Sequence, residues 1–285
     1  MKIAIIGMGL IGASLGRAIL KYTSHEVYGF DISPDVLERA TELKAHTRAL
    51  CDSDYKNLDL VIFALNPDIA IAEMERICPL LKNGATVADT CGNKRIICDE
   101  MSALKNKYPN LHFVGTHPMA GREYSGIEYS TPDLFNGAYM ILVPIAADVQ
   151  AAAVLNRLSL EIGFKGVEVC SAAHHDEMIA YTSQLAHVVS SCYVQNPHSK
   201  EHAGYSAGSF ADLTRVARLN PDMWTELFLK NKDNLLSCID DIKCRLENIE
   251  NALKESDELK LKELLAHGTA CKEMADCVLK EKNNE

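Results

Sequence analysis

Short apolar runs alternate with amphipathic segments along the first half of the chain. The runs are rich in β-branched residues, and the segments between them place apolar residues at helical spacing. Six runs stand out: KIAIIG from Lys2, EVYGFD from Glu26, LDLVIFAL from Leu58, ATVADT from Ala85, HFVGTH from His112 and YMILVP from Tyr139. Such alternation predicts parallel strands joined by crossover helices, so the expected fold class is α/β with a doubly wound, Rossmann-type sheet.

Serine and proline mark where two of the helices begin. Ser33 before Pro34 has the form of a helix cap followed by proline at the first helical position, and Pro67 opens the helix after the third run. A further helix over about residues 148–162 and a strand over residues 166–170 complete this part. We therefore expect one domain over residues 1–170.

The pattern changes after residue 170, where no clear strand run remains. Apolar residues recur at helical spacing over residues 175–194, 210–219 and 222–253, which predicts an all-helical domain over residues 171–285. In its long last stretch an apolar stripe is formed by Leu235, Ile239, Ile242, Leu246, Ile249 and Leu253. The stripe predicts a homodimer interface or packing within the domain, and periodicity alone does not choose between them.

Composition narrows the range of partners. The 285 residues carry 29 Lys and Arg against 39 Asp and Glu, and a formal charge of −10 without a basic block disfavours nucleic acid and anionic membranes. No apolar run is long enough to span a bilayer, and no secretory signal is recognisable. The ten cysteines are scattered without a CxxC pair, so we expect reduced thiols, no metal site and a cytoplasmic protein.

Three glycines follow the first predicted strand as Gly7-x-Gly9-x-x-Gly12, with Leu10 and Ile11 between the last two. In this position, between a strand and a helix, the pattern is typical of dinucleotide binding. The first glycine permits a tight turn, the second lets a pyrophosphate approach the backbone, and the third lets helix and strand pack closely. The competing interpretation is a glycine-rich turn without a ligand.

Asp31 ends the second predicted strand, nineteen residues after Gly12. A carboxylate here accepts hydrogen bonds from the adenosine ribose and repels a 2′-phosphate, so the expected cofactor is NAD. Asp31 as a simple helix cap is the alternative, although Ser33 suits that role better. These features alone predict an NAD-dependent oxidoreductase whose helical second domain closes the site of a small-molecule substrate.

Longer motifs resemble those of the prephenate dehydrogenase family along nearly the whole chain. Residues 114–126, VGTHPMAGREYSG, resemble the family's histidine motif. His175-Asp176 followed by SQLAH at residues 183–187 resembles its HD...SHLPH helix, and FADLTRVA at residues 210–217 resembles its FRDxTRIA motif. The resemblance implies NAD-dependent oxidative decarboxylation of prephenate to 4-hydroxyphenylpyruvate, on the route to tyrosine.

The resemblance also implies roles for single residues. His117 is the expected general base, and Arg215 the guanidinium that holds a substrate carboxylate. His187 is expected to hydrogen-bond substrate or cofactor, with a histidine of the core as the alternative. The resemblance further assigns Glu123, Trp224, Asp212 and Gly92 to the substrate pocket, although Trp224 is nearly as well explained as a core or interface residue.

Departures from the family motifs bear on substrate choice. Where many members read D-x-G-S-x-K, residues 89–94 read DTCGNK, so Gly92 replaces the serine that hydrogen-bonds the catalytic histidine in the family. Gln184 replaces the first histidine of SHLPH, and Ala211 replaces the arginine of FRD. Arogenate is therefore an alternative substrate to prephenate.

Two further alternatives differ in class. A β-hydroxyacid dehydrogenase shares the predicted domain plan, but residues 174–189 lack the catalytic lysine of that family. A non-catalytic NAD sensor would explain the missing serine, yet His117, Arg215 and Asp31 together favour an enzyme. The length also predicts no fused mutase or ACT domain.

Overall fold

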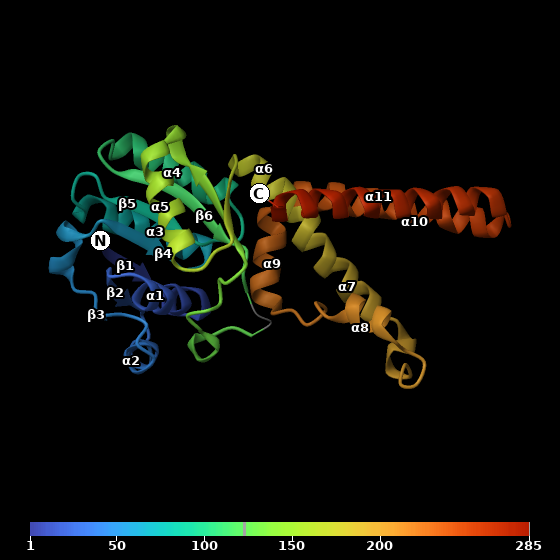
Figure 1. The fold of residues 1–285 in the computed structure, drawn as a ribbon, viewed down its shortest axis with the longest axis horizontal. Coiled ribbons are helices and arrows are strands. Elements are labelled where there is room, and N and C mark those ends of the chain that lie inside the picture. The colour runs from blue at the N-terminus through green and yellow to red at the C-terminus, as the bar shows by residue number, and fades with distance from the viewer. Residues whose placement is uncertain (122–123, 285) are drawn as a thin grey trace. The chain divides into compact units, whose positions relative to one another are not determined.

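The computed structural model describes residues 1–121 and 124–284. The chain divides into two compact units, Met1–Lys232 and Asp233–Glu285. The first unit holds an eight-stranded sheet with strands β1 Lys2–Ile6, β2 Glu26–Phe30, β3 Arg48–Ala49, β4 Leu60–Phe63, β5 Thr86–Asp89, β6 His112–Pro118, β7 Tyr139–Pro144 and β8 Gly166–Val169. The expected doubly wound sheet is confirmed (Figure 1).

The strand order is β3-β2-β1-β4-β5-β6-β7-β8. Strands β1 to β6 are parallel, whereas β7 runs antiparallel to β6, with His117 opposite Ile141, and β8 is parallel to β7. The expectation that all the predicted strands run parallel is therefore wrong for Tyr139–Pro144. The 119–138 connection supplies no crossover helix among the described residues, so the chain returns along the strand it has just left.

Five helices of this unit cover the two faces of the sheet: α1 Leu10–Tyr22, α2 Pro34–Glu42, α3 Pro67–Ile77, α4 Arg95–Lys107 and α5 Val149–Glu161. Alternate residues of the buried strands point to opposite faces, so Ile5 joins a core with α1, α2 and α5. Ile6 joins the other core, with α3 and α4. The two-sided burial explains why the strands read as nearly continuous apolar runs.

The predicted helix starts are found where the sequence places them. The Ser33 hydroxyl accepts from the Val36 N–H and caps α2, which begins at Pro34. Helix α3 begins at Pro67. Asp148 caps α5 through a hydrogen bond from the Ala151 N–H, 3.1 Å long. These caps fix where the helices leave the sheet edges.

After residue 170 the described part of the chain contains helices joined by turns and no strand. In the first unit lie α6 Ala172–Ile179, a π-helical turn Ala180–Leu185, α7 Ala186–Val194, α8 Gly208–Thr214 and α9 Pro221–Lys230. The second unit consists almost entirely of α10 Lys232–Lys254 and α11 Glu258–Asn284. Helix α8 ends at Thr214, earlier than the predicted 210–219 segment, and Asn231 interrupts the predicted helix over residues 222–253.

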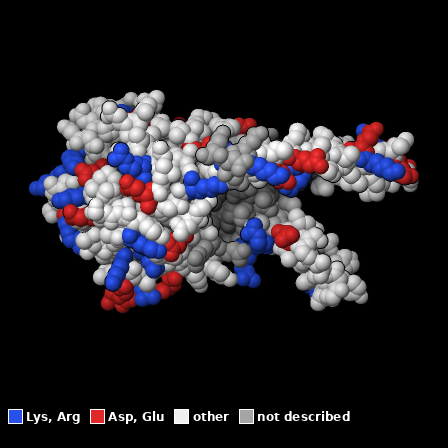
Figure 2. All heavy atoms as spheres, viewed as in Figure 1, with Lys and Arg blue, Asp and Glu red and all other residues white. Residues whose placement is uncertain are grey.

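Charged side chains of both signs mix on the surface. On the face shown in Figure 2, Lys and Arg lie among Asp and Glu without forming one large patch of either sign. No helix within the described residues is long and apolar enough to cross a membrane. The cytoplasmic location stays a prediction.

Candidate active site

The dinucleotide corner is built where β1 meets α1. Gly7 has φ +96°, in the left-handed region that favours glycine, and its N–H donates to the Phe30 carbonyl. A Cβ on Gly12 would come within 1.9 Å of the Gly7 carbonyl oxygen, so only glycine fits at position 12. At Gly9, in contrast, a Cβ would meet no atom within 4 Å. The turn is thus tight on the protein side and open at Gly9, where a pyrophosphate would approach.

The N-terminus of α1 faces this opening. Helix α1 starts at Leu10, followed by the half-buried Ile11, and no described side chain caps it. Asp31 stands beside the turn, where its carboxylate accepts from the Met8 N–H at 2.8 Å and from the Ser33 N–H at 3.0 Å. The helix end favours a phosphate, and the oriented carboxylate favours a ribose diol. These residues therefore fit NAD.

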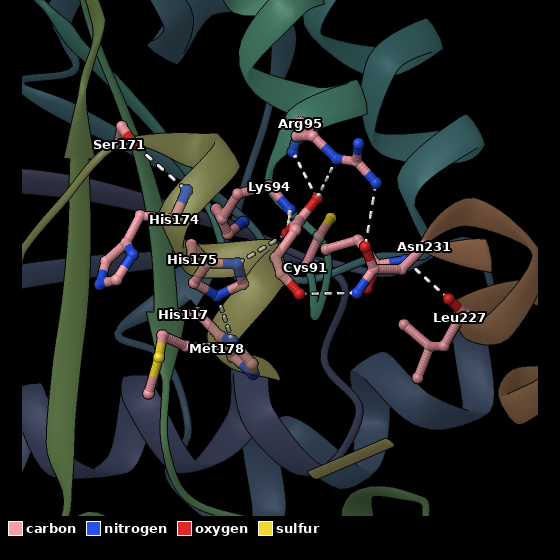
Figure 3. A network of polar contacts seen from close by, with 12 residues as sticks. Cys91, Lys94, Arg95, His117, Ser171, His174, His175, Met178, Leu227 and Asn231 are labelled. Atoms are coloured by element: carbon pink, nitrogen blue, oxygen red, sulfur yellow. Dashed lines mark hydrogen bonds and ion pairs between the residues drawn. The ribbon is translucent and has the colours of Figure 1, made fainter. Parts of the chain in front are cut away.

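His117 lies at the carboxyl end of β6, at the same sheet edge as the dinucleotide corner. Its Nδ1 is 2.8 Å from Nε2 of His175 on α6, and Nδ1 of His175 is 2.7 Å from Oδ1 of Asp176 (Figure 3). Burial, followed by the effects of His175 and the Lys94 ammonium, holds the pKa of His117 well below the ordinary histidine value. His117 is consequently a neutral proton acceptor around neutral pH.

Asp176 is a fully buried carboxylate with several donors. Burial alone would raise its pKa, but the hydrogen bonds from His175 and from the backbone N–H groups of Lys94 and Arg95 outweigh burial and lower it. The Lys94 N–H donates at 2.7 Å and the Arg95 N–H at 3.0 Å, so Asp176 caps the start of α4. This contact joins the helical segment to the sheet at the site.

A second buried ion pair joins Lys94 to Asp89, and the Lys94 ammonium is near enough to His117 to lower its pKa. Burial would lower the pKa of Lys94, but the Asp89 carboxylate outweighs burial and raises it, so the ammonium is charged. Asp89 also accepts from the backbone N–H groups of Cys91, at 2.7 Å, and Thr116, at 3.0 Å. The pair thereby fixes the ends of β5 and β6 next to each other.

Amide side chains tie α9 to the same edge. Asn231 donates to the Asp176 carbonyl at 2.8 Å and to Gln184 Oε1 at 2.9 Å, and Gln184 donates in turn to Asn93 Oδ1 at 3.2 Å. Asn93 and Gln184 both donate to the Leu227 carbonyl, at 2.9 and 3.3 Å. Gln184, at the position of a family histidine, therefore forms part of a buried amide network.

Gly92 lies under Leu227. A Cβ at Gly92 would stand 3.0 Å from Leu227 Cδ2, which is a tight contact. The space next to the missing serine is thus partly filled by a leucine side chain from α9. Among the described residues, the His117 ring forms its hydrogen bond with His175 and not with residue 92.

The remaining predicted pocket residues are more dispersed. His187 on α7 lies against Trp224 on α9, with ring centroids 4.0 Å apart, and its Nδ1 hydrogen-bonds the Ser183 carbonyl. Arg215 and Asp212 are exposed at α8, and no contact within the described residues joins either of them to His117. Glu123 lies outside the described residues.

Sequence reasoning does not find the partners of His117. His175 and Asp176 stand out only as part of a motif, although a His-Asp pair is a recognisable pairing of a titratable ring with a carboxylate. Lys94 and Asn231 have no predicted role, and nothing in the sequence indicates that a lysine at position 94 is fully buried. Both residues make contacts across long stretches of sequence: Lys94 with Asp176, 82 residues away, and Asn231 with Arg95, 136 residues away.

Comparison with known proteins shows to which family the chain is similar. Residues 15–168 match the family model described as prephenate dehydrogenase, nucleotide-binding domain, and residues 171–267 match prephenate dehydrogenase, dimerization domain. Cyclohexadienyl dehydrogenase of Zymomonas mobilis is 32% identical over 265 residues, covering 90% of this chain and 89% of the relative. Prephenate dehydrogenase of Lactococcus lactis is 30% identical over 274 residues, covering 92% and 71%.

A solved structure has the same fold over almost the whole chain. The crystal structure of prephenate dehydrogenase from A. aeolicus, in complex with hydroxyphenyl propionate and NAD+, superimposes with a TM-score of 0.84 at 26% identity, covering 96% of this chain and 98% of that one. Together with the dinucleotide corner, these matches identify an NAD-dependent oxidoreductase. The chain belongs to the prephenate dehydrogenase family.

Proposed function

We propose that this enzyme oxidises and decarboxylates prephenate to 4-hydroxyphenylpyruvate. The observation that carries the proposal is the neutral, hydrogen-bonded His117 at the sheet edge that also holds the dinucleotide corner. In α/β sheets, ligands bind at this carboxyl edge. The reaction requires a proton acceptor beside the ring hydroxyl and an oxidant at the carbon that bears it, and this edge provides for both.

His117 acts as the general base. Its pKa lies below the ordinary value because the half-buried ring loses solvation and lies near His175 and Lys94, so the imidazole is unprotonated at neutral pH and accepts the hydroxyl proton. Bound NAD supplies the acceptor for the hydride. Formation of the aromatic ring drives loss of the ring carboxylate as carbon dioxide. His117 therefore has to accept one proton, in a reaction that formation of the aromatic ring makes favourable.

Arg215 binds a carboxylate of the substrate. Prephenate carries two carboxylates, and the chain has a formal charge of −10, so a cation near the substrate offsets an unfavourable overall field. Arg215 is exposed and forms no ion pair with the residues that the structure describes, which leaves its guanidinium fork able to engage a planar carboxylate bidentately.

The decisive experiment follows NADH or NADPH formation by the purified full-length chain with prephenate and with arogenate, each with NAD and with NADP. We expect prephenate with NAD to have the highest kcat/KM. A higher value with arogenate would assign the enzyme to that substrate and make Gly92, Gln184 and Ala211 candidate specificity determinants. No turnover in any combination, by protein that still binds NAD, would overturn the proposal in favour of an NAD sensor.

The enzyme is proposed to act as a homodimer through the helical residues 171–285. The dimerization-domain match supports this, and so do the exposed apolar side chains of the second unit, which include Leu246, Leu253, Leu259, Leu265, Met274 and Leu279. An apolar surface of this kind on one helix pair is typical of an interface. Sedimentation of the full chain should give twice the 31.4 kDa of one chain, and a monomer at micromolar concentration would contradict the dimer.

A further inference from the structure

Two hydrogen bonds link Asp176, His175 and His117, and the donor and the acceptor of each can be assigned, beginning at Asp176. Oδ1 of this carboxylate accepts from the Lys94 N–H at 2.7 Å, and Oδ2 accepts from the Arg95 N–H at 3.0 Å and from Arg95 Nε at 3.3 Å. Backbone N–H groups only donate, so both oxygens act as acceptors and carry no proton. The ring nitrogen of His175 that lies 2.7 Å from Oδ1 must therefore be the donor.

The position of the proton on His175 determines the position of the proton on His117. A neutral imidazole has one N–H and one bare nitrogen, so a proton on Nδ1 of His175 leaves its Nε2 bare. That bare Nε2 lies 2.8 Å from Nδ1 of His117, which must then carry the proton and donate. The remaining nitrogen of His117, Nε2, is left with a free lone pair.

The reverse direction would require a doubly protonated His175. Its ring is almost completely buried, with 1% of its surface exposed, and burial lowers its pKa in spite of the opposing effect of Asp176. The other charged groups around the two rings are the Lys94 ammonium, which also disfavours a cation, and Asp89, which is already paired with Lys94. The neutral pair of rings with this single proton arrangement is thus the stable one near neutral pH.

We propose that His175 and Asp176 are positioning residues that fix the tautomer of His117, so that Nε2 is its proton-accepting atom. This inference rests on the proposed function, in which His117 is the base. When the substrate hydroxyl loses its proton, the O–H bond breaks, an N–H bond forms at Nε2, and the O–H electron pair stays on the oxygen. The resulting positive charge is stabilised through His175 by the Asp176 carboxylate, and no further reactant is needed.

The tautomer is measured directly by ¹⁵N NMR of the histidine rings in the full chain at pH 7.5, with peaks assigned through H117N and H175Q. Protonated and bare ring nitrogens resonate far apart, so the two tautomers are distinguishable without any substrate. We expect His117 to carry its proton on Nδ1 and to have a bare Nε2. A proton on Nε2 of His117 in the wild-type chain would overturn the proposal.

Kinetics provide the second test, with His174→Gln as the matched control. His174 neighbours His175 on α6 but is exposed, and Figure 3 shows its ring outside the hydrogen-bond chain. We expect H175Q to lower kcat about 100-fold with KM for prephenate nearly unchanged, and to move the acidic limb of the pH profile up toward the ordinary histidine pKa, since burial by His175 is lost. H174Q should change neither.

Asp176→Asn extends the test. The amide group can accept at only one of the two positions where the carboxylate oxygens accept. With its NH2 group at the position of Oδ1, it donates to Nδ1 of His175, which reverses the direction of the hydrogen bonds and puts the proton of His117 on Nε2. In serine proteases the comparable substitution lowers turnover about 10⁴-fold by this means.

Turnover and pH profile of H175Q equal to those of H174Q would overturn the positioning role. If the wild-type chain turns over no substrate, the proposed function fails, while the ring spectra still decide the tautomer.

Discussion

Leu227 and Gly92 face each other across the site, so that a Cβ on Gly92 would lie 3.0 Å from Leu227 Cδ2. The backbone of Leu227 is held by two amide donors, Asn93 and Gln184, which leaves only the end of the leucine side chain free to yield. The absence of a side chain at Gly92, the position of the family serine, thus leaves room for the Leu227 side chain.

Gly92→Ser should therefore lower the free energy of unfolding by about 1 kcal/mol through overpacking against Leu227. In the Leu227→Ala background the same substitution should cost less, because the crowding atoms are gone. Urea unfolding followed by the fluorescence of Trp224, the single tryptophan, measures all four proteins of the cycle. Strictly additive effects would contradict direct crowding between positions 92 and 227.

His117→Asn should lower kcat by about two to four orders of magnitude, since the base is lost. The affinity for NAD should stay within a few-fold of wild type, because the dinucleotide corner contains none of the groups that contact His117. Single-turnover kinetics and NAD titration separate the two effects. A parallel loss of NAD binding would instead assign His117 to the cofactor site.

The pH dependence of kcat/KM should reflect the lowered pKa of His117. Burial and the neighbouring His175 and Lys94 disfavour the imidazolium, so the base stays neutral as the pH falls through the ordinary value of about 6.5. The rate should be flat from pH 7.5 down to 6.5 and decline only at lower pH. A profile that already falls by half near pH 6.5 would show that the ring titrates as an exposed histidine does.

Asp31→Asn should weaken the preference for NAD over NADP by about tenfold. The amide retains an acceptor for the Met8 N–H but removes the negative charge that repels a 2′-phosphate. Asp35→Asn is the matched control, as it removes an exposed carboxylate in the first turn of α2. The ratio of kcat/KM with the two cofactors is the measurement. An equal change in both variants would mean that general surface charge sets the preference.

The fold could be predicted from the sequence to the extent that local patterns determine it. Runs such as LDLVIFAL are buried on both sides and read as strands, and Ser33 before Pro34 marks a helix start by local chemistry alone. The two-residue strand Arg48–Ala49 is too short to leave a pattern. The direction of Tyr139–Pro144 is also absent from its composition, because an apolar run is the same in a parallel and an antiparallel pair.

The site is less accessible to sequence reasoning for a similar reason. Gly7, Gly12 and Asp31 act through neighbours in one βαβ unit, and their spacing is a local signal. His175 acts through a ring 58 residues away in sequence, and only tertiary packing brings the two nitrogens within 2.8 Å. The hydrogen-bond chain behind His117 is therefore a property of the fold rather than of any one motif.

Arg215→Ala should raise KM for prephenate by about 10- to 100-fold and change kcat only a few-fold. A charge-assisted hydrogen bond to a carboxylate contributes about 1.5–3 kcal/mol, and the loss falls on binding because the carboxylate is present in both substrate and transition state. Arg218→Ala is the matched control, since Arg218 is exposed in the same segment after α8. Because Arg215 makes no ion pair with the described part of the chain, its replacement should leave the melting temperature unchanged. An unchanged KM, or equal increases in the two variants, would show that Arg215 does not bind the substrate carboxylate.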